Sequence, residues 1–86
     1  MTIELIEEAI IKADLTREEA ASLFRVTRNT LYRWLQGKPI RNKMMEEFAV
    51  YTAKRILNAV AQKKLPLSGG RVDKLGDIKK ILLTIK

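Results

Sequence analysis

Residues 18–40 read EEAASLFRVTRNTLYRWLQGKPI, and this stretch contains two helix signals separated by a very short connection. Thr16 lies just before the stretch, and Glu19 follows it by three residues, which is the spacing of a capping box. In a capping box, side chain and backbone groups at the start of a helix satisfy each other's hydrogen bonds. The spacing therefore predicts a short helix over residues 17–24.

A second helix is expected directly after the first. Thr27 can accept a hydrogen bond from the backbone at the helix start, and the helical pattern continues to Gln36. Gly37 supplies a left-handed exit from this helix, and Pro39 prevents it from resuming immediately. Only residues 25–26 separate the two helices, so the chain has to turn sharply between them.

The apolar and small residues of the two helices occupy positions where the helices can touch. Ala20 and Ala21 are small enough to let another helix cross closely, and Phe24 closes the pair. Leu31 and Trp34, three residues apart, return the contact from the second helix. This spacing is typical of a helix-turn-helix, in which two helices meet at a steep angle.

The polar face of the second helix has the chemistry of DNA recognition. At about 100 degrees per residue, Asn29, Arg33 and Gln36 fall opposite Leu31 and Trp34. Asparagine and arginine have the hydrogen-bonding shapes that recognise adenine and guanine in the major groove. The first helical residues can approach a phosphate or a base edge. The candidates for reading bases are Thr27, Arg28, Asn29, Tyr32, Arg33 and Gln36.

The positive charge is concentrated around this helix. Residues 25–43 carry six basic side chains and no acidic one, whereas residues 1–24 carry six acidic and two basic ones. The whole chain has a formal net charge of +7. An acid-free window between acid-bearing segments indicates a face that meets a polyanion. The candidates for phosphate contact are Arg17, Lys38, Arg41 and Lys43.

Residues 13–41 resemble the phage repressor and Cro-like helix-turn-helix family of bacterial and phage transcription regulators. The matching residues are Ala21, Val26, Thr27, Leu31, Trp34, Gly37 and Pro39. The resemblance implies a lambda repressor-like domain that binds operator DNA as a two-fold dimer. It also implies base reading by Thr27, Arg28, Asn29, Tyr32 and Arg33 and phosphate contact by Arg17. Arg25 stands where the family usually has glycine, so an arginine is expected there at a positive φ.

The rest of the chain is also expected to be helical, which gives an all-α domain of about five helices. A helix over residues 3–13 has Thr2 as its expected cap, and a long helix begins after Asn42 and continues to about Lys63. Its apolar stripe comprises Met45, Phe48, Ala49, Thr52, Ile56, Ala59 and Val60. A loop with Pro66 and the pair Gly69-Gly70 leads to a tail over residues 73–86, where helix is favoured and a strand over 81–85 is the alternative.

Residues 1–64 are thus interpreted as the DNA-binding unit, and residues 65–86 as a segment that packs on it or contributes to dimerisation. The chain of 86 residues forms one domain with a modest core, so association with a second copy would help to stabilise it. Helix 42–63 or the C-terminal segment is expected to form the dimer surface. A dimer would place its two recognition helices about 34 Å apart, one turn of DNA.

Composition argues against catalysis. The chain has no cysteine and no histidine, which removes disulfides, zinc sites of thiolate or imidazole, and the usual general base near neutral pH. We therefore expect no enzyme activity, no metal or other cofactor, and no small-molecule ligand. The longest apolar run is Phe48 to Tyr51, and the first residues are acidic, so a cytoplasmic protein of a bacterial or phage-infected cell is expected.

The function that these features favour is sequence-specific transcription regulation, with a small repressor as the principal interpretation. Two other classes stay open. An architectural or recombination accessory protein, of the excisionase type, would bind extended and repeated sites. An antitoxin or antirepressor would use the tail after Gly70 to bind a protein partner, with DNA binding secondary.

Overall fold

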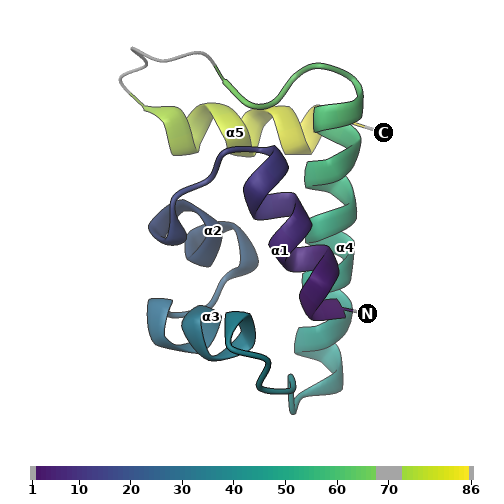
Figure 1. Cartoon of the computed structure of the whole chain (residues 1–86). Coiled ribbons are helices and arrows are strands. Elements are labelled where there is room, and N and C mark those ends of the chain that lie inside the picture. The colour runs from purple at the N-terminus through teal and green to yellow at the C-terminus, as the bar shows by residue number, and fades with distance from the viewer. Residues whose placement is uncertain (1, 68–72, 86) are drawn as a thin grey trace.

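The computed structural model describes residues 2–67 and 73–85, and these residues form five helices and no strand (Figure 1). The expected all-α class is confirmed. The pair Gly69-Gly70 of the expected loop lies outside the described residues. The helices are α1 (Thr2–Lys12), α2 (Arg17–Phe24), α3 (Arg28–Leu35), α4 (Lys43–Ala61) and α5 (Lys74–Thr84).

The longest helix, α4, supports the other elements. α1 packs along it, and α5 lies across its C-terminal end, at the top of Figure 1. In the view of Figure 1, α2 and α3 lie to the left of α1 and α4, with α3 at the lower left. α2 contacts both α3 and α4, and α3 also contacts α1. The Cα radius of gyration is 12.3 Å, close to the ~12 Å of a compact domain of this length.

All five helices share one hydrophobic core. The largest fully buried side chains come from each helix in turn, and they are Ile6, Phe24, Leu31, Ile56 and Ile78. Alanines at Ala9, Ala20, Ala49, Ala53 and Ala59 are also buried and let the helices approach closely. Leu65 and Ile85 are buried too, so the segment after residue 64 contributes to the same core.

Three of the four expected helix caps are present. The Thr16 hydroxyl accepts a hydrogen bond from the Glu19 amide at 3.1 Å, and the Glu19 carboxylate accepts one from the Thr16 amide at 2.8 Å. Thr27 caps α3 through a bond from the Thr30 amide, at 3.2 Å. Asn42 caps α4 in the same way, at 3.1 Å from the Met45 amide. These caps satisfy amides that the first helical turn leaves without partners.

The expected cap at Thr2 is wrong. The helix already includes Thr2, so this residue is the first of α1, and its hydroxyl donates to Glu46 of α4 across 3.4 Å. α4 ends at Ala61, slightly earlier than expected, because the chain leaves the helix through Lys63 at a φ of +63°. In the tail, the helical interpretation is confirmed and the strand alternative is wrong, since α5 extends to Thr84.

α5 has a cap that the sequence analysis did not predict. Asp73 accepts a hydrogen bond from the Gly76 amide at 3.0 Å. Within the described ranges, every helix is too short or too polar to traverse a lipid bilayer.

Candidate nucleic-acid interface

The connection between α2 and α3 is a tight turn with a left-handed residue. Arg25 has φ +59° and ψ +44°, which confirms the positive φ expected there. The Val26 amide donates to the carbonyl of Ala21 at 3.0 Å, so the turn satisfies the end of α2 with backbone bonds. Arg25 holds its guanidinium 5.2 Å from the centre of the Phe48 ring of α4. The turn is thereby connected to the core helix behind it.

α3 is anchored to the core along one face. Leu31 is fully buried, and Trp34 is only 4% exposed. Phe24 at the end of α2 is buried in the same cluster. Because three residues span most of a helical turn, burial of Leu31 and Trp34 leaves the opposite side of this short helix to face solvent.

The six base-reading candidates all lie on the surface, as the exposed face of α3 requires. Thr27, Arg28, Asn29, Tyr32, Arg33 and Gln36 are each exposed. Three of them already have partners. The Thr27 hydroxyl caps α3 and bonds to the Thr30 hydroxyl at 2.9 Å, Arg28 pairs with Glu18 at 3.2 Å, and the Tyr32 ring lies against the Arg17 guanidinium. Asn29, Arg33 and Gln36 therefore form the part of the face that is most available to a ligand.

A shallow hollow lies at the N-terminal end of α3. It is lined by Arg17, Thr27, Arg28, Asn29 and Tyr32. The Arg17 guanidinium lies 5.5 Å from the centre of the Tyr32 ring, which orients the cation and the phenol together. The amino end of α3 carries a partial positive charge, so this hollow combines two arginines with a helix dipole that favours an anion.

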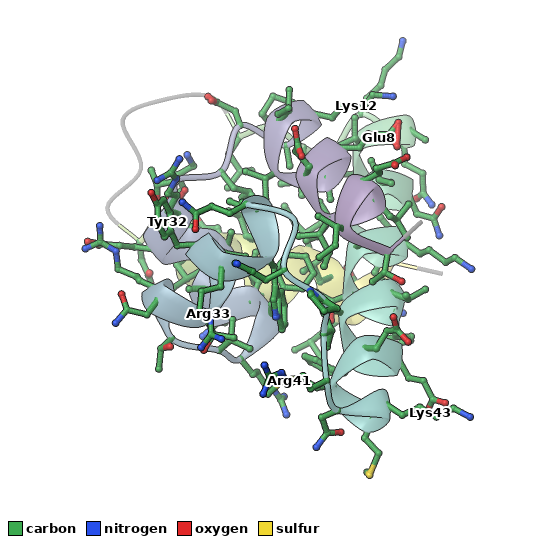
Figure 2. All side chains as sticks on the ribbon, turned by 60° about the horizontal axis from the view of Figure 1, so that its bottom comes forward. Glu8, Lys12, Tyr32, Arg33, Arg41 and Lys43 are labelled. Carbon is green, nitrogen blue, oxygen red and sulfur yellow. The ribbon has the colours of Figure 1, made fainter. Side chains whose placement is uncertain are left out.

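A second hollow lies on the other side of α3. Arg33 lines it together with Lys38 and Arg41 from the segment between α3 and α4. In Figure 2, Arg33 and Arg41 point toward the same lower edge of the molecule. Two of the phosphate candidates are thus brought beside the central base-reading candidate. Lys43 is in neither hollow and projects from the start of α4, away from Arg33 (Figure 2).

Five residues of the second hollow were not among the candidates. Besides Trp34 of the core and Pro39 after α3, they are Thr30, Asn42 and Met45. Asn42 had been interpreted as a cap, and Met45 as part of the apolar stripe of the long helix, yet Met45 lies on the surface. A signal for Thr30, Asn42 and Met45 was present, because all three lie in or beside the acid-free window.

Two of the base-reading candidates have acidic neighbours: Arg28 pairs with Glu18, and Gln36 lines a third hollow together with Glu4, Glu7 and Glu46. Glu8 forms an ion pair with Lys12 at 3.1 Å on α1, at the opposite edge of Figure 2 from Arg33 and Arg41. Glu19 lies within 3.3 Å of the Lys74 ammonium. Partial burial raises the pKa of Glu19, but its hydrogen bonds with Thr16 and Lys74 and the charge of that lysine outweigh burial and lower the pKa.

The groups around α3 have the chemistry of anion binding. In residues 2–67 and 73–85, no three histidine, cysteine, aspartate or glutamate side chains are grouped so that they could hold a metal ion. The arrangement offers amide and guanidinium donors along α3, with cations on both sides. Comparisons with protein-family models, with curated proteins and with solved structures find no match for the chain.

Proposed function

We propose that this protein is a sequence-specific DNA-binding transcription regulator, with α2, the turn at Arg25 and α3 acting as a helix-turn-helix. The observation that carries the proposal is the face of α3. Burial of Leu31 and Trp34 orients Asn29 and Arg33 outward together, in a part of the chain that has no acidic residue. On this proposal the chain is a member of the phage repressor and Cro-like family.

The dimensions of α3 fit the major groove. An α-helix with its side chains is about 10 to 12 Å across, and the major groove of B-DNA is about 12 Å wide. Asn29 and Arg33 are four residues apart, so they lie one above the other on the helix surface. In this reading Asn29 binds an adenine and Arg33 a guanine, each pair contributing about 1 to 3 kcal/mol of discrimination against other bases.

The cations on either side of α3 contact the DNA backbone. Arg17 lies at the hollow of the N-terminal end, and Lys38 and Arg41 line the hollow beside Arg33. Backbone contacts position the helix and carry little sequence information. Each contact releases condensed counterions, so affinity should decrease steeply as salt concentration rises.

The mode of regulation that we propose is repression by occupancy of an operator. A two-fold dimer, formed through α4 or the C-terminal segment, would bind two half-sites about 34 Å apart. Support comes from the small size of the domain, because the five helices are all used to build one core that presents α3. An in vitro transcription assay tests this mode: activation from a site outside the promoter would contradict it.

The DNA-binding proposal is tested by selecting bound duplexes from a randomised library at near-physiological salt and sequencing them. We expect an inverted repeat with half-sites about one helical turn apart. The Arg33→Ala variant, selected in parallel, should lose preference at one base position in each half-site. Recovery of DNA without any enriched sequence would contradict sequence-specific reading, and an extended array of direct repeats would favour the architectural class.

A further inference from the structure

The structure has a groove between α2, α4 and α5 that the proposed DNA contact does not use. Its apolar surface comes from Leu23, Phe48 and Leu82, one residue from each helix. Tyr51 and Leu83 also line it and are 56% and 83% exposed. Large apolar side chains grouped at a surface are typical of an interaction site.

The groove is positively charged, and contacts within the protein orient one of its arginines. Its charged lining residues are Arg25, Arg55 and Lys79, and no acidic residue lines it. The Arg55 guanidinium lies 5.3 Å from the centre of the Tyr51 ring and donates hydrogen bonds to the carbonyls of Leu82 and Ile85. No carboxylate in the described part of the chain pairs with any of the three cations. The groove thus suits an acidic helix with an apolar side chain.

α1 presents such a helix surface on the same protein. Glu4, Glu7, Glu8 and Ile11 are spaced three and four residues apart, so they form one stripe along α1. They line a shallow hollow together with Lys12, and Ile11 is 69% exposed. Glu8 pairs with Lys12, so Glu4 and Glu7 supply the carboxylates without an ion pair, and together with Ile11 they complement the cations and the apolar surface of the groove.

We infer that the groove between α2, α4 and α5 binds the acidic stripe of α1 from a second copy of this chain. The groove contains no residue of α1, and the hollow along the stripe contains no residue of α2, α4 or α5. One copy can therefore offer both surfaces at once. Neither surface includes a residue of α3, but Glu4 and Glu7 also line a hollow with Gln36. The contact therefore lies beside one end of the proposed DNA-binding face and leaves Asn29 and Arg33 uncovered. The inference concerns the protein without DNA and does not depend on the proposed function.

Charge reversals with matched controls test the contact by sedimentation equilibrium of the full chain without DNA. Glu7→Lys reverses a charge on the stripe, and Glu47→Lys makes the same change at an exposed site of α4 outside both surfaces. Lys79→Glu reverses a charge in the groove, and Lys80→Glu is its control on the neighbouring residue. The altered side chains are all exposed, so each variant should keep the wild-type circular dichroism spectrum.

The wild type should associate reversibly at about 50 mM salt and more weakly at about 500 mM, where screening is strong. Glu7→Lys and Lys79→Glu should each weaken association at least about tenfold, because an attraction becomes a repulsion, and the two controls should behave as the wild type. The combined variant Glu7→Lys/Lys79→Glu, and an equimolar mixture of the two single variants, should regain association.

A wild type that stays monomeric up to high micromolar concentration at both salt concentrations would overturn the inference. Association that survives both test reversals would overturn it as well, because the copies would then meet on another surface. A combined variant that does not regain association would also overturn the inference. A monomeric wild type would also count against the proposed two-fold dimer, but the library selection reports base preference directly, so failure of this contact and failure of DNA reading are separable.

Discussion

Replacing Ile78 by alanine tests whether α5 is an integral part of the core that supports α3. Ile78 is fully buried on α5. The substitution removes three carbon atoms, and at about 0.8 kcal/mol for each buried methylene the transfer term is about 2.4 kcal/mol. The cavity left behind brings the expected loss to about 3 kcal/mol, within the range of about 2 to 5 kcal/mol for such changes. A domain of 86 residues has a total stability of about 4 to 13 kcal/mol, so the loss is large.

The assay uses Trp34, the single tryptophan of the chain, which is buried on α3. Urea unfolding followed by Trp34 fluorescence reports on the helix that presents the candidate interface, and far-ultraviolet circular dichroism reports on all helices. With a urea dependence of about 1.5 kcal/mol per molar, the midpoint of Ile78→Ala should decrease by about 2 M in both signals. Leu83→Ala is the control, since this leucine lies on the same helix but is exposed. At a protein concentration low enough to keep the chain monomeric, it should change stability by less than about 0.5 kcal/mol.

A Trp34 transition that stays at the wild-type midpoint, while circular dichroism shows an early partial loss of helix, would show that α5 unfolds independently and does not share the core of α3. Equal effects of Ile78→Ala and Leu83→Ala would contradict the burial that separates these two residues.

Three further predictions concern the interface, the cap of α2 and the turn. Arg33→Ala should relax preference at one base position. Arg17→Ala should weaken binding to all duplexes alike and reduce the dependence of affinity on salt concentration by about one phosphate contact. Equal effects of the two variants in a binding titration would show that the assigned roles are wrong. The lowered pKa of Glu19 adds stability that is complete above the usual value of 4.5 and is lost as pH falls through the folded value. Glu19→Gln should therefore flatten the decrease in urea midpoint on acidification, and an unchanged pH profile would contradict this. At Arg25, φ is +59°. In urea unfolding, Arg25→Gly should be about 1 kcal/mol more stable than Arg25→Ala, because both variants lack the guanidinium and only alanine is strained at this φ. Greater stability of Arg25→Ala would contradict the left-handed turn.

The tail shows where sequence patterns reach their limit. Ile78, Leu82 and Ile85 have helical spacing, yet residues 81–85 taken alone fit a strand as well. The structure forms α5 there because Asp73 caps it and Ile78 packs into a core built by the other four helices. Deleting residues 65–86 would therefore remove Leu65, Ile78 and Ile85 from that core and expose the apolar surface beneath them.

Thr2 and Met45 also differ from their sequence-based predictions, because of the elements that lie opposite them in the fold. Thr2 has the chemistry of a cap, but the helix includes it, and its hydroxyl donates to Glu46 on another helix. Met45 has the spacing of a core residue on α4, but no helix covers it, and it lines the hollow beside Arg33. Each outcome depends on which other element lies opposite the residue, and a helical period does not contain that information.

The local structure that frames α2 and α3 follows from neighbouring residues: the capping box at Thr16, the cap at Thr27, the turn between the helices and the outward stripe of Asn29 and Arg33. These features depend on hydrogen bonds and spacings within a few residues, so a local pattern is enough to predict them. The grouping of Lys38 and Arg41 with Arg33 in one hollow, and of cations from three parts of the chain in one apolar groove, is visible only in the folded protein. Those groupings arise from the packing of helices that are distant in sequence, and the shared core sets that packing.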